Sequence, residues 1–198
     1  MTPELTAIKF PIAIRTEHIV TQQTTFRIQQ HGKGLNSGNF TIFEPDDKST
    51  GNKSGSNATP QQPLLQVDGK YGKLDERRSF SDASGLPLFE LYHKAMGVTC
   101  MLKDNMDVSV RSAVPGEVDI VLQVRGQDIW KQRTNVYLGD KVIMTTKRTD
   151  KLSVYLPGKK LEWDVEIAAG MDISLASVIV VVLAANMYNS SMQASSSK

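Results

Sequence analysis

The side chains with the clearest potential for chemistry are basic ones in the last third of the chain. They gather around one predicted hairpin and the turn after it, and two more flank a strand start: Lys141, Lys147, Arg148, Lys151, Lys159, Lys160, Lys131 and Arg133. A positive charge near an anionic membrane contributes about 1 kcal/mol of binding free energy, so this cluster indicates contact with phosphates on lipid headgroups. A solvated charged face of a β-structure gives the same pattern, and that interpretation stays open.

Histidine and cysteine offer less chemistry. The three histidines, His18, His31 and His93, are widely spaced and have no cysteine or carboxylate partner at zinc-binding spacing. Cys100 is the single cysteine, and no catalytic signature surrounds it. We therefore expect a non-enzymatic protein with no catalytic residue, no metal site and no cofactor. An enzyme built around Cys100 is the alternative.

Short β-type runs separated by turns must position the basic residues. Runs rich in Val, Ile, Phe and Tyr occupy residues 10–20, 24–30, 39–43, 64–67, 78–80, 86–92, 98–102, 108–110, 118–124, 135–137, 142–146, 152–156 and 162–167. The first of these reads as a strand or an extended lead-in. Many short strands at regular spacing favour an all-β barrel or sandwich. At 82–85 an Asp-Ala-Ser-Gly turn has a physical reason, because Asp and Ser bond their own backbone and Gly permits positive φ.

Two polar segments interrupt or follow this pattern. Residues 45–63 are dense in Ser, Gly, Asn, Lys and Pro, and such a segment cannot bury enough apolar surface to order itself. We predict a flexible loop inserted between two strands of a single domain that covers residues 1–198. The Ser-rich residues 189–198 are predicted to be a disordered tail.

Composition bounds the partners and the compartment. The 198 residues are 40% hydrophobic and 22% charged, which fits one globular domain. Lys and Arg total 23 against 21 Asp and Glu, so the strong basic excess of a nucleic-acid binder is absent and we expect no nucleic-acid partner. A single cysteine fits a reducing compartment, and no secretory signal is evident. We expect a cytoplasmic protein.

An apolar run over residues 173–187 follows Asp172, which can cap a helix start. A helix that is apolar on all sides lies in a core or in a membrane. Fifteen residues span roughly 22 Å as a helix, against about 30 Å of bilayer hydrocarbon, so length favours the core and we expect no transmembrane segment. The β-branched residues 178–182 would suit a buried strand equally well, so the residues alone leave helix and strand open.

Three motifs together suggest a family. They are Gly-Asn-Phe-Thr-Ile at 38–42, Ser-Asp-Ala-Ser-Gly-Leu-Pro-Leu at 81–88, and Gly-Met-Asp at 170–172 before the apolar run. In this order, over roughly residues 10–188, the chain resembles the LURP-one-related family of tubby C-terminal-like proteins. The resemblance implies a mainly β fold, a closed antiparallel barrel of about twelve strands around one hydrophobic C-terminal helix, which leaves no exposed sheet edge. It would place residues 173–187 inside the barrel. The long loop at 45–63 and the Ser-rich tail depart from the family pattern.

The resemblance also implies a function class. Tubby relatives bind phosphoinositides, and phospholipid scramblases share the barrel. We expect a monomeric binding or adaptor module, peripheral at the membrane, that binds phosphoinositide or other anionic phospholipid headgroups through Lys141, Lys147, Arg148, Lys151, Lys159 and Lys160. The tubby lipid-binding motif has no residue-by-residue match here. Two alternatives stay open: a scramblase-like membrane-associated protein anchored by residues 173–187, and an adaptor for a protein partner with no lipid role.

Overall fold

A computed structural model describes residues 4–9, 11–31, 39–44, 62–69, 75–94, 105–110, 120–127, 133–149 and 161–196. Three features predicted from the sequence lie outside these ranges, wholly or nearly so: the strands at 98–102 and 152–156, and the inserted loop, of which residues 45–61 are not described. The elements below belong to the described part of the chain.

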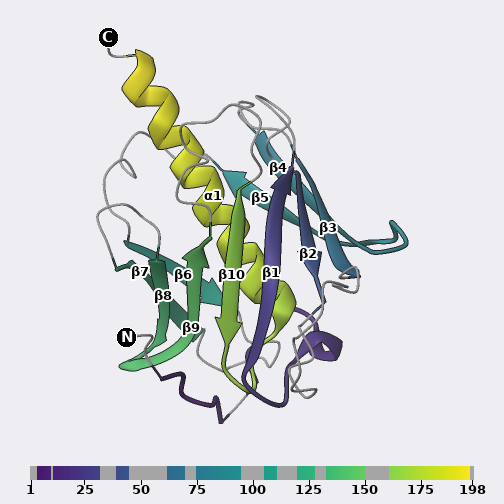
Figure 1. Ribbon diagram of the computed structural model, residues 1–198, viewed down its shortest axis with the longest axis vertical. Helices are drawn as coiled ribbons and strands as arrows, with labels where there is room; N and C mark the ends of the chain where they lie inside the picture. Colours follow the sequence, from purple (N-terminus) through teal and green to yellow (C-terminus); the bar gives the residue numbers. More distant parts are fainter. Residues whose placement is uncertain are drawn as a thin grey trace, which may run out of the picture.

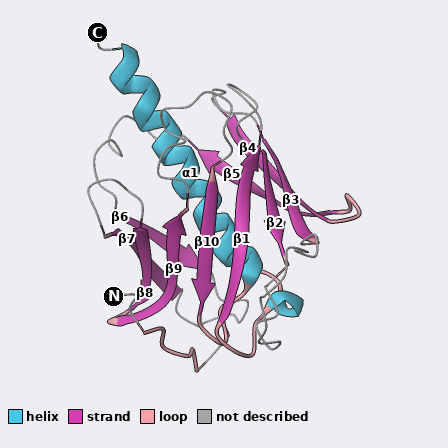
Figure 2. Ribbon diagram, in the orientation of Figure 1, coloured by secondary structure: helices cyan, strands magenta, loops and turns pink. Residues whose placement is uncertain are grey.

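Ten strands form one antiparallel sheet that curves around a long C-terminal helix (Figures 1 and 2). Their order is β5-β4-β3-β2-β1-β10-β9-β8-β7-β6. The bounds are β1 Thr24–His31, β2 Asn39–Phe43, β3 Pro63–Gly69, β4 Asp75–Asp82, β5 Pro87–Lys94, β6 Asn105–Val110, β7 Ile120–Gly126, β8 Arg133–Leu138, β9 Lys141–Arg148 and β10 Glu162–Ile167, with the helix α1 at Ile173–Ser196. The pairing of β1 with β10 joins the two halves of the chain.

The mainly β fold with one helix confirms the predicted class, but the predicted barrel is not confirmed. The described strands number ten, and β5 and β6 stand at the two ends of their order. Since no pairing joins β5 to β6 within the described ranges, the described sheet is not closed into a barrel.

Alternation of apolar and polar residues explains why the central strands form where they do. On β1, Phe26 and Ile28 are buried, and their cross-strand partners Val165 and Trp163 on β10 are buried as well. The residues between them point to the outer face. A shift of one residue in register would carry this whole apolar set to the solvent, so burial on one face specifies the pairing.

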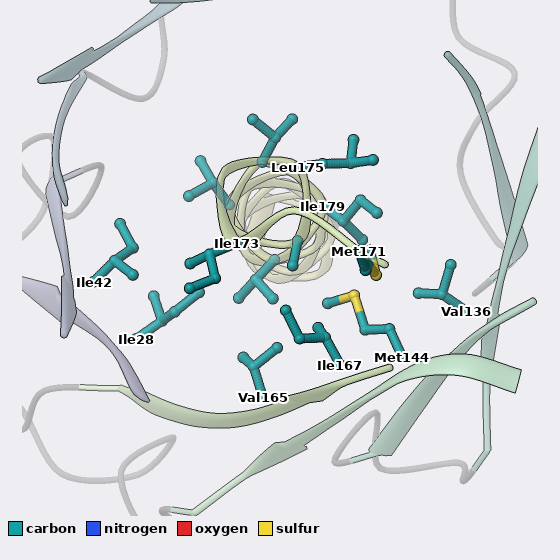
Figure 3. Packing of buried hydrophobic residues seen from close by; sticks show 14 of the residues in the cluster. Ile28, Ile42, Val136, Met144, Val165, Ile167, Met171, Ile173, Leu175 and Ile179 are labelled. Atoms are coloured by element: carbon teal, nitrogen blue, oxygen red, sulfur yellow. The ribbon is translucent and has the colours of Figure 1, made fainter. Parts of the chain in front are cut away.

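The run after Asp172 is the helix α1, so the strand interpretation of residues 178–182 is wrong. Both helical and β propensities are weak against packing, and here residues 173–181 of the helix are buried in one core with the inner face of the curved sheet. Figure 3 looks along the helix axis and shows Ile28, Val136, Met144 and Ile167 arranged around Ile173–Ile179. The helix continues through Ser196, into the segment predicted to be a tail, and its C-terminal end projects past the strands in Figure 1.

The N-terminal segment crosses the end of the sheet where α1 begins, which we call the Asp172 end. Backbone hydrogen bonds attach it there: Ile8 N–H donates to Ala169 at 2.9 Å, and Val20 N–H donates to Met171 at 3.0 Å. The 3-10 helix η1, Thr16–His18, interrupts this segment, and only isolated bridges flank it in the described structure. Residues 11–20 are therefore an extended lead-in and not a strand.

The turn between β4 and β5 follows the predicted chemistry. The Oδ1 atom of Asp82 accepts hydrogen bonds from the Ser84 hydroxyl at 2.7 Å and from the N–H groups of Ser84 and Leu86, each at 2.9 Å. The Ser84 hydroxyl first, and then the Leu86 N–H, lower the pKa of the Asp82 carboxyl. Gly85 completes the turn at φ 86°, a left-handed conformation that favours glycine.

Candidate anion-binding surface

Two of the basic residues that the structure describes, Arg133 and Lys147, lie on the outer face of β8 and β9. Lys141 and Lys147 are both exposed and stand at the two ends of β9. Arg133, at the start of β8, is exposed and is the direct cross-strand partner of Lys147. We call Arg133 and Lys147 the basic pair. Directly opposite residues lie about 5 Å apart at Cβ, so the pair concentrates two positive charges.

Acidic side chains of β10 border the basic pair on the side of Lys147. Lys147 is also the cross-strand partner of Asp164 on β10, whose outer face carries Glu162, Asp164 and Glu166 at alternate positions. On β1, the Arg27 Nε lies 3.4 Å from the Asp164 Oδ1. The outer face therefore runs Arg133, Lys147, Asp164 and Arg27 from β8 to β1, and its two adjacent cations lie on the β8–β9 side.

The remaining predicted lysines belong to the connection between β9 and β10. Lys151, Lys159 and Lys160 lie outside the described residues. The connection leaves β9 after Arg148 and enters β10 at Glu162, so its described ends lie beside Lys147. The grouping of these lysines with the basic pair stays a prediction.

Arg148 does not share the exposed surface with Lys147. Its exposed fraction is 5%, and it lies on the inner face of β9 together with Met144 and Thr146. Its cross-strand partner there is Trp163, which is buried too. Successive side chains of a strand point to opposite faces, so two adjacent basic residues cannot both line one surface. Arg148 lies two and four positions after the buried Thr146 and Met144, so strand alternation places it on their face and Lys147 on the other. This alternation was the available sequence signal.

A constellation that sequence reasoning missed lies at the Asp172 end. The His18 Nδ1 and the Ser174 Oγ are 2.6 Å apart, and the Asp172 Oδ1 accepts the Ser174 N–H at 2.6 Å. These are the residue types of a hydrolytic triad, but their geometry differs from one. Asp172 bonds backbone N–H groups instead of the His18 ring, and Ser174 is fully buried. A triad needs a base oriented by the acid and a reachable nucleophile. The arrangement is a helix cap.

The described ranges contain no group of three or more His, Cys, Asp or Glu side chains placed to hold a metal ion. No helix there combines the length and the hydropathy needed to cross a bilayer. Cys100 lies outside the described residues.

Comparison with known proteins bears on the family. Neither the curated proteins nor the solved structures gave a match. The family model described as LURP-one-related matches residues 24–184, which is more than half of the chain. That range begins at the first residue of β1 and ends within α1, so it includes all ten described strands. The chain therefore belongs to the LURP-one-related family.

Proposed function

We infer that this protein is a non-enzymatic binding module that docks on anionic phospholipid headgroups, with phosphoinositides as the favoured class. The observation that carries the inference is the basic pair, in which the exposed Arg133 and Lys147 face each other across β8 and β9. Lys141, exposed at the start of β9, and Lys151, Lys159 and Lys160 of the sequence would add further positive charge. The module is a monomer in the cytoplasm that associates peripherally with the membrane.

The charges set the orientation in which the protein would meet a membrane. Each cation near an anionic leaflet contributes about 1 kcal/mol, whereas the carboxylates of β10 are repelled by it. The protein would therefore meet the membrane with the β8–β9 side and turn Glu162, Asp164 and Glu166 away. Exposed charges are screened over about 10 Å at 0.1 M salt, so the association must weaken as salt rises.

The fold proposed for the module is a closed barrel of about twelve strands, because closure would pair the two end strands of the described sheet. Membership in the LURP-one-related family and the resemblance to tubby C-terminal-like proteins support this closure. The helix α1 would then lie along the interior of the barrel, where its residues 173–181 are already buried.

An adaptor for a protein partner is the second candidate. It is favoured by the mixed row Arg133, Lys147, Asp164 and Arg27, because alternating charges suit a complementary protein surface better than a uniformly anionic bilayer. The two candidates predict opposite roles for the Asp164 carboxylate. Lipid docking is strengthened when it is removed, whereas a charge-matched protein interface is weakened.

Vesicle flotation tests the lipid function. Phosphatidylcholine vesicles with and without phosphatidylinositol bisphosphate are mixed with the wild type, with the double variant Arg133→Glu/Lys147→Glu, and with Lys9→Glu as a control. Lys9 is exposed in the N-terminal segment, outside the basic pair. We expect the double variant to lose at least about tenfold in vesicle affinity, since two cations become anions. Lys9→Glu should stay within about twofold, well under the effect of one charge at the surface.

Salt and Asp164 complete the test. Wild-type flotation should fall as salt rises, and Asp164→Asn should increase it. Flotation that ignores salt, or that the double variant retains in full, contradicts headgroup docking. An absence of flotation with phosphoinositide vesicles leaves the protein adaptor as the better candidate.

A further inference from the structure

Arg148 occupies an unusual position for a cation. It is the last residue of β9, it lies on the inner face of the sheet, and its exposed fraction is 5%. Its Nε is fully buried and makes no hydrogen bond in the described structure. An arginine side chain stays charged in proteins, and a buried donor of a charged group that has no acceptor is destabilising. Such a cation calls for an anion.

The described residues do not supply that anion. Asp172 is the one carboxylate among their buried polar side chains. It follows the far end of β10, whereas Arg148 pairs with Trp163 near the start of that strand. Both Asp172 oxygens are already engaged by backbone N–H groups. The cap at the Asp172 end therefore does not neutralise Arg148.

The neighbours of Arg148 on the inner face include two buried aromatic side chains and a buried glutamine. Trp163 is directly opposite, and its ring centroid lies 6.1 Å from that of Phe40 on β2. Gln30 on β1 belongs to the same face, one inward position beyond Ile28, and its N–H donates to the Leu161 carbonyl. Aromatic walls lower the local dielectric, which strengthens a charged hydrogen bond formed there.

We propose that Arg148 anchors an anion-binding site on the inner face of the sheet, and that its ligand presents a phosphate group at the end of β9. The planar guanidinium matches a phosphate in a bidentate arrangement, which an ammonium group does not. A phospholipid headgroup and a soluble phosphate ester share this chemistry. The site uses none of the residues of the basic pair, so it stands independently of the docking function.

Thermal melting gives a first readout that needs no known ligand. The variant Arg148→Met keeps much of the side-chain volume and removes the buried charge. In phosphate-free buffer it should melt at a higher temperature than the wild type, because replacing an unpaired buried charge by an apolar group is stabilising. Lys147→Met, at the exposed neighbouring position, should leave the melting temperature nearly unchanged. A lower melting temperature for Arg148→Met would show that the guanidinium is satisfied within the fold, and it would overturn the proposal.

Titration with two soluble probes, inorganic phosphate and inositol trisphosphate, gives the second readout. The protein has two tryptophans, so a Trp130→Phe background leaves Trp163, the partner of Arg148, as the reporter of binding. We expect a fluorescence change and a rise in melting temperature with a probe, since binding to the native state alone stabilises it. Arg148→Lys should weaken the probe at least about tenfold, the effect of losing one charged hydrogen bond, and Arg148→Met should abolish its binding.

The outcomes separate this site from the basic pair. Probe binding that survives in Arg133→Glu/Lys147→Glu and disappears in Arg148→Met supports the proposal, whether or not the vesicles float. Competition by phosphatidylinositol bisphosphate vesicles against the soluble probe identifies a lipid headgroup as the source, and a lack of competition identifies a soluble phosphate ester. Equal probe binding by the wild type and Arg148→Met, or binding of neither probe, overturns it.

Discussion

The Asp172 carboxylate accepts a hydrogen bond from the Arg15 backbone N–H at 2.9 Å, although 157 positions separate the two residues in sequence. The same oxygen accepts the Ile14 N–H at 2.8 Å, and the other oxygen accepts the Ser174 N–H at 2.6 Å. One side chain therefore caps α1 and attaches the N-terminal segment to it. Asp172 is fully buried, and its hydrogen bond to the Ser174 N–H is buried as well.

Removing this carboxylate should cost more than the loss of an ordinary helix cap. An N-cap substitution by alanine typically costs about 1 kcal/mol, and each buried donor left without an acceptor adds about 1–3 kcal/mol. We expect Asp172→Ala to lower the free energy of unfolding by about 3 kcal/mol or more, and Asp172→Asn to lie between it and the wild type. Urea denaturation followed by circular dichroism measures both. A loss of about 1 kcal/mol for Asp172→Ala would mean that only the helix cap matters.

Gly170 is needed where the chain turns from β10 into α1. Its φ is +90°, and a Cβ there would meet the Ile8 carbonyl oxygen at 2.8 Å. Gly85 has a similar φ of +86° and nothing within 4 Å of such a Cβ, so Gly85→Ala isolates the cost of backbone conformation. That cost is about 1–2 kcal/mol. We expect Gly170→Ala to lower the melting temperature clearly more than Gly85→Ala, and equal losses would show that the Ile8 contact does not constrain Gly170.

The fold was predictable from the sequence wherever the pattern is local. The strands at 39–43 and 162–167 have the predicted bounds, and the capping role expected of Asp172 is confirmed. The identity of residues 178–182 as helix was not decidable locally, because it depends on the strands that surround them. The attachment of Arg15 to Asp172 had no sequence signal, since only tertiary folding brings these residues together.

The candidate site was predictable to a smaller degree. Grouping basic residues by proximity in sequence placed Lys147 and Arg148 on one surface, whereas the pleat of β9 separates them. The pairing of Lys147 with Arg133 requires the register of β8 against β9. A bulge between Val136 and Tyr137 shifts that register, so counting residues from the turn does not give it.

The inserted loop can be tested from its two described ends. Glu44 N–H donates to the Gln62 carbonyl at 2.9 Å, so the chain leaves and re-enters the β2–β3 pair at neighbouring positions. A short Asn-Gly turn can therefore replace residues 45–61 without moving either strand. We expect an equal or higher melting temperature, since each halving of a flexible loop recovers about 0.6 kcal/mol of closure entropy. A large drop would show that the loop contributes contacts to the fold.

The turn at Asp82 should make stability depend on pH in acid. Its pKa is lowered from the ordinary 3.8, chiefly by the Ser84 hydroxyl, so the folded state favours the carboxylate. The stabilisation is complete above the unfolded value and is lost as the pH falls through the lowered folded pKa. The melting-temperature difference between the wild type and Asp82→Asn should therefore shrink as the pH falls from the unfolded pKa of Asp82 through its lowered folded pKa. Ser84→Ala should move the loss to higher pH, and a difference that does not vary with pH would contradict the assignment.

Val181 tests whether α1 is the centre of the core. Its side chain is fully buried in the helix, so an aspartate there would place a charge where no partner is available among its apolar neighbours. We expect Val181→Asp to abolish folding, because an unpaired buried charge costs several kcal/mol against a total stability of about 5–15 kcal/mol. Val181→Ile should cost only about 1–3 kcal/mol from overpacking. Val121→Asp is the matched control, since Val121 on β7 is 47% exposed and should tolerate the charge. Soluble yield and thermal melting of the three variants decide the matter, and a soluble Val181→Asp with a normal melting curve would show that the helix is peripheral to the core.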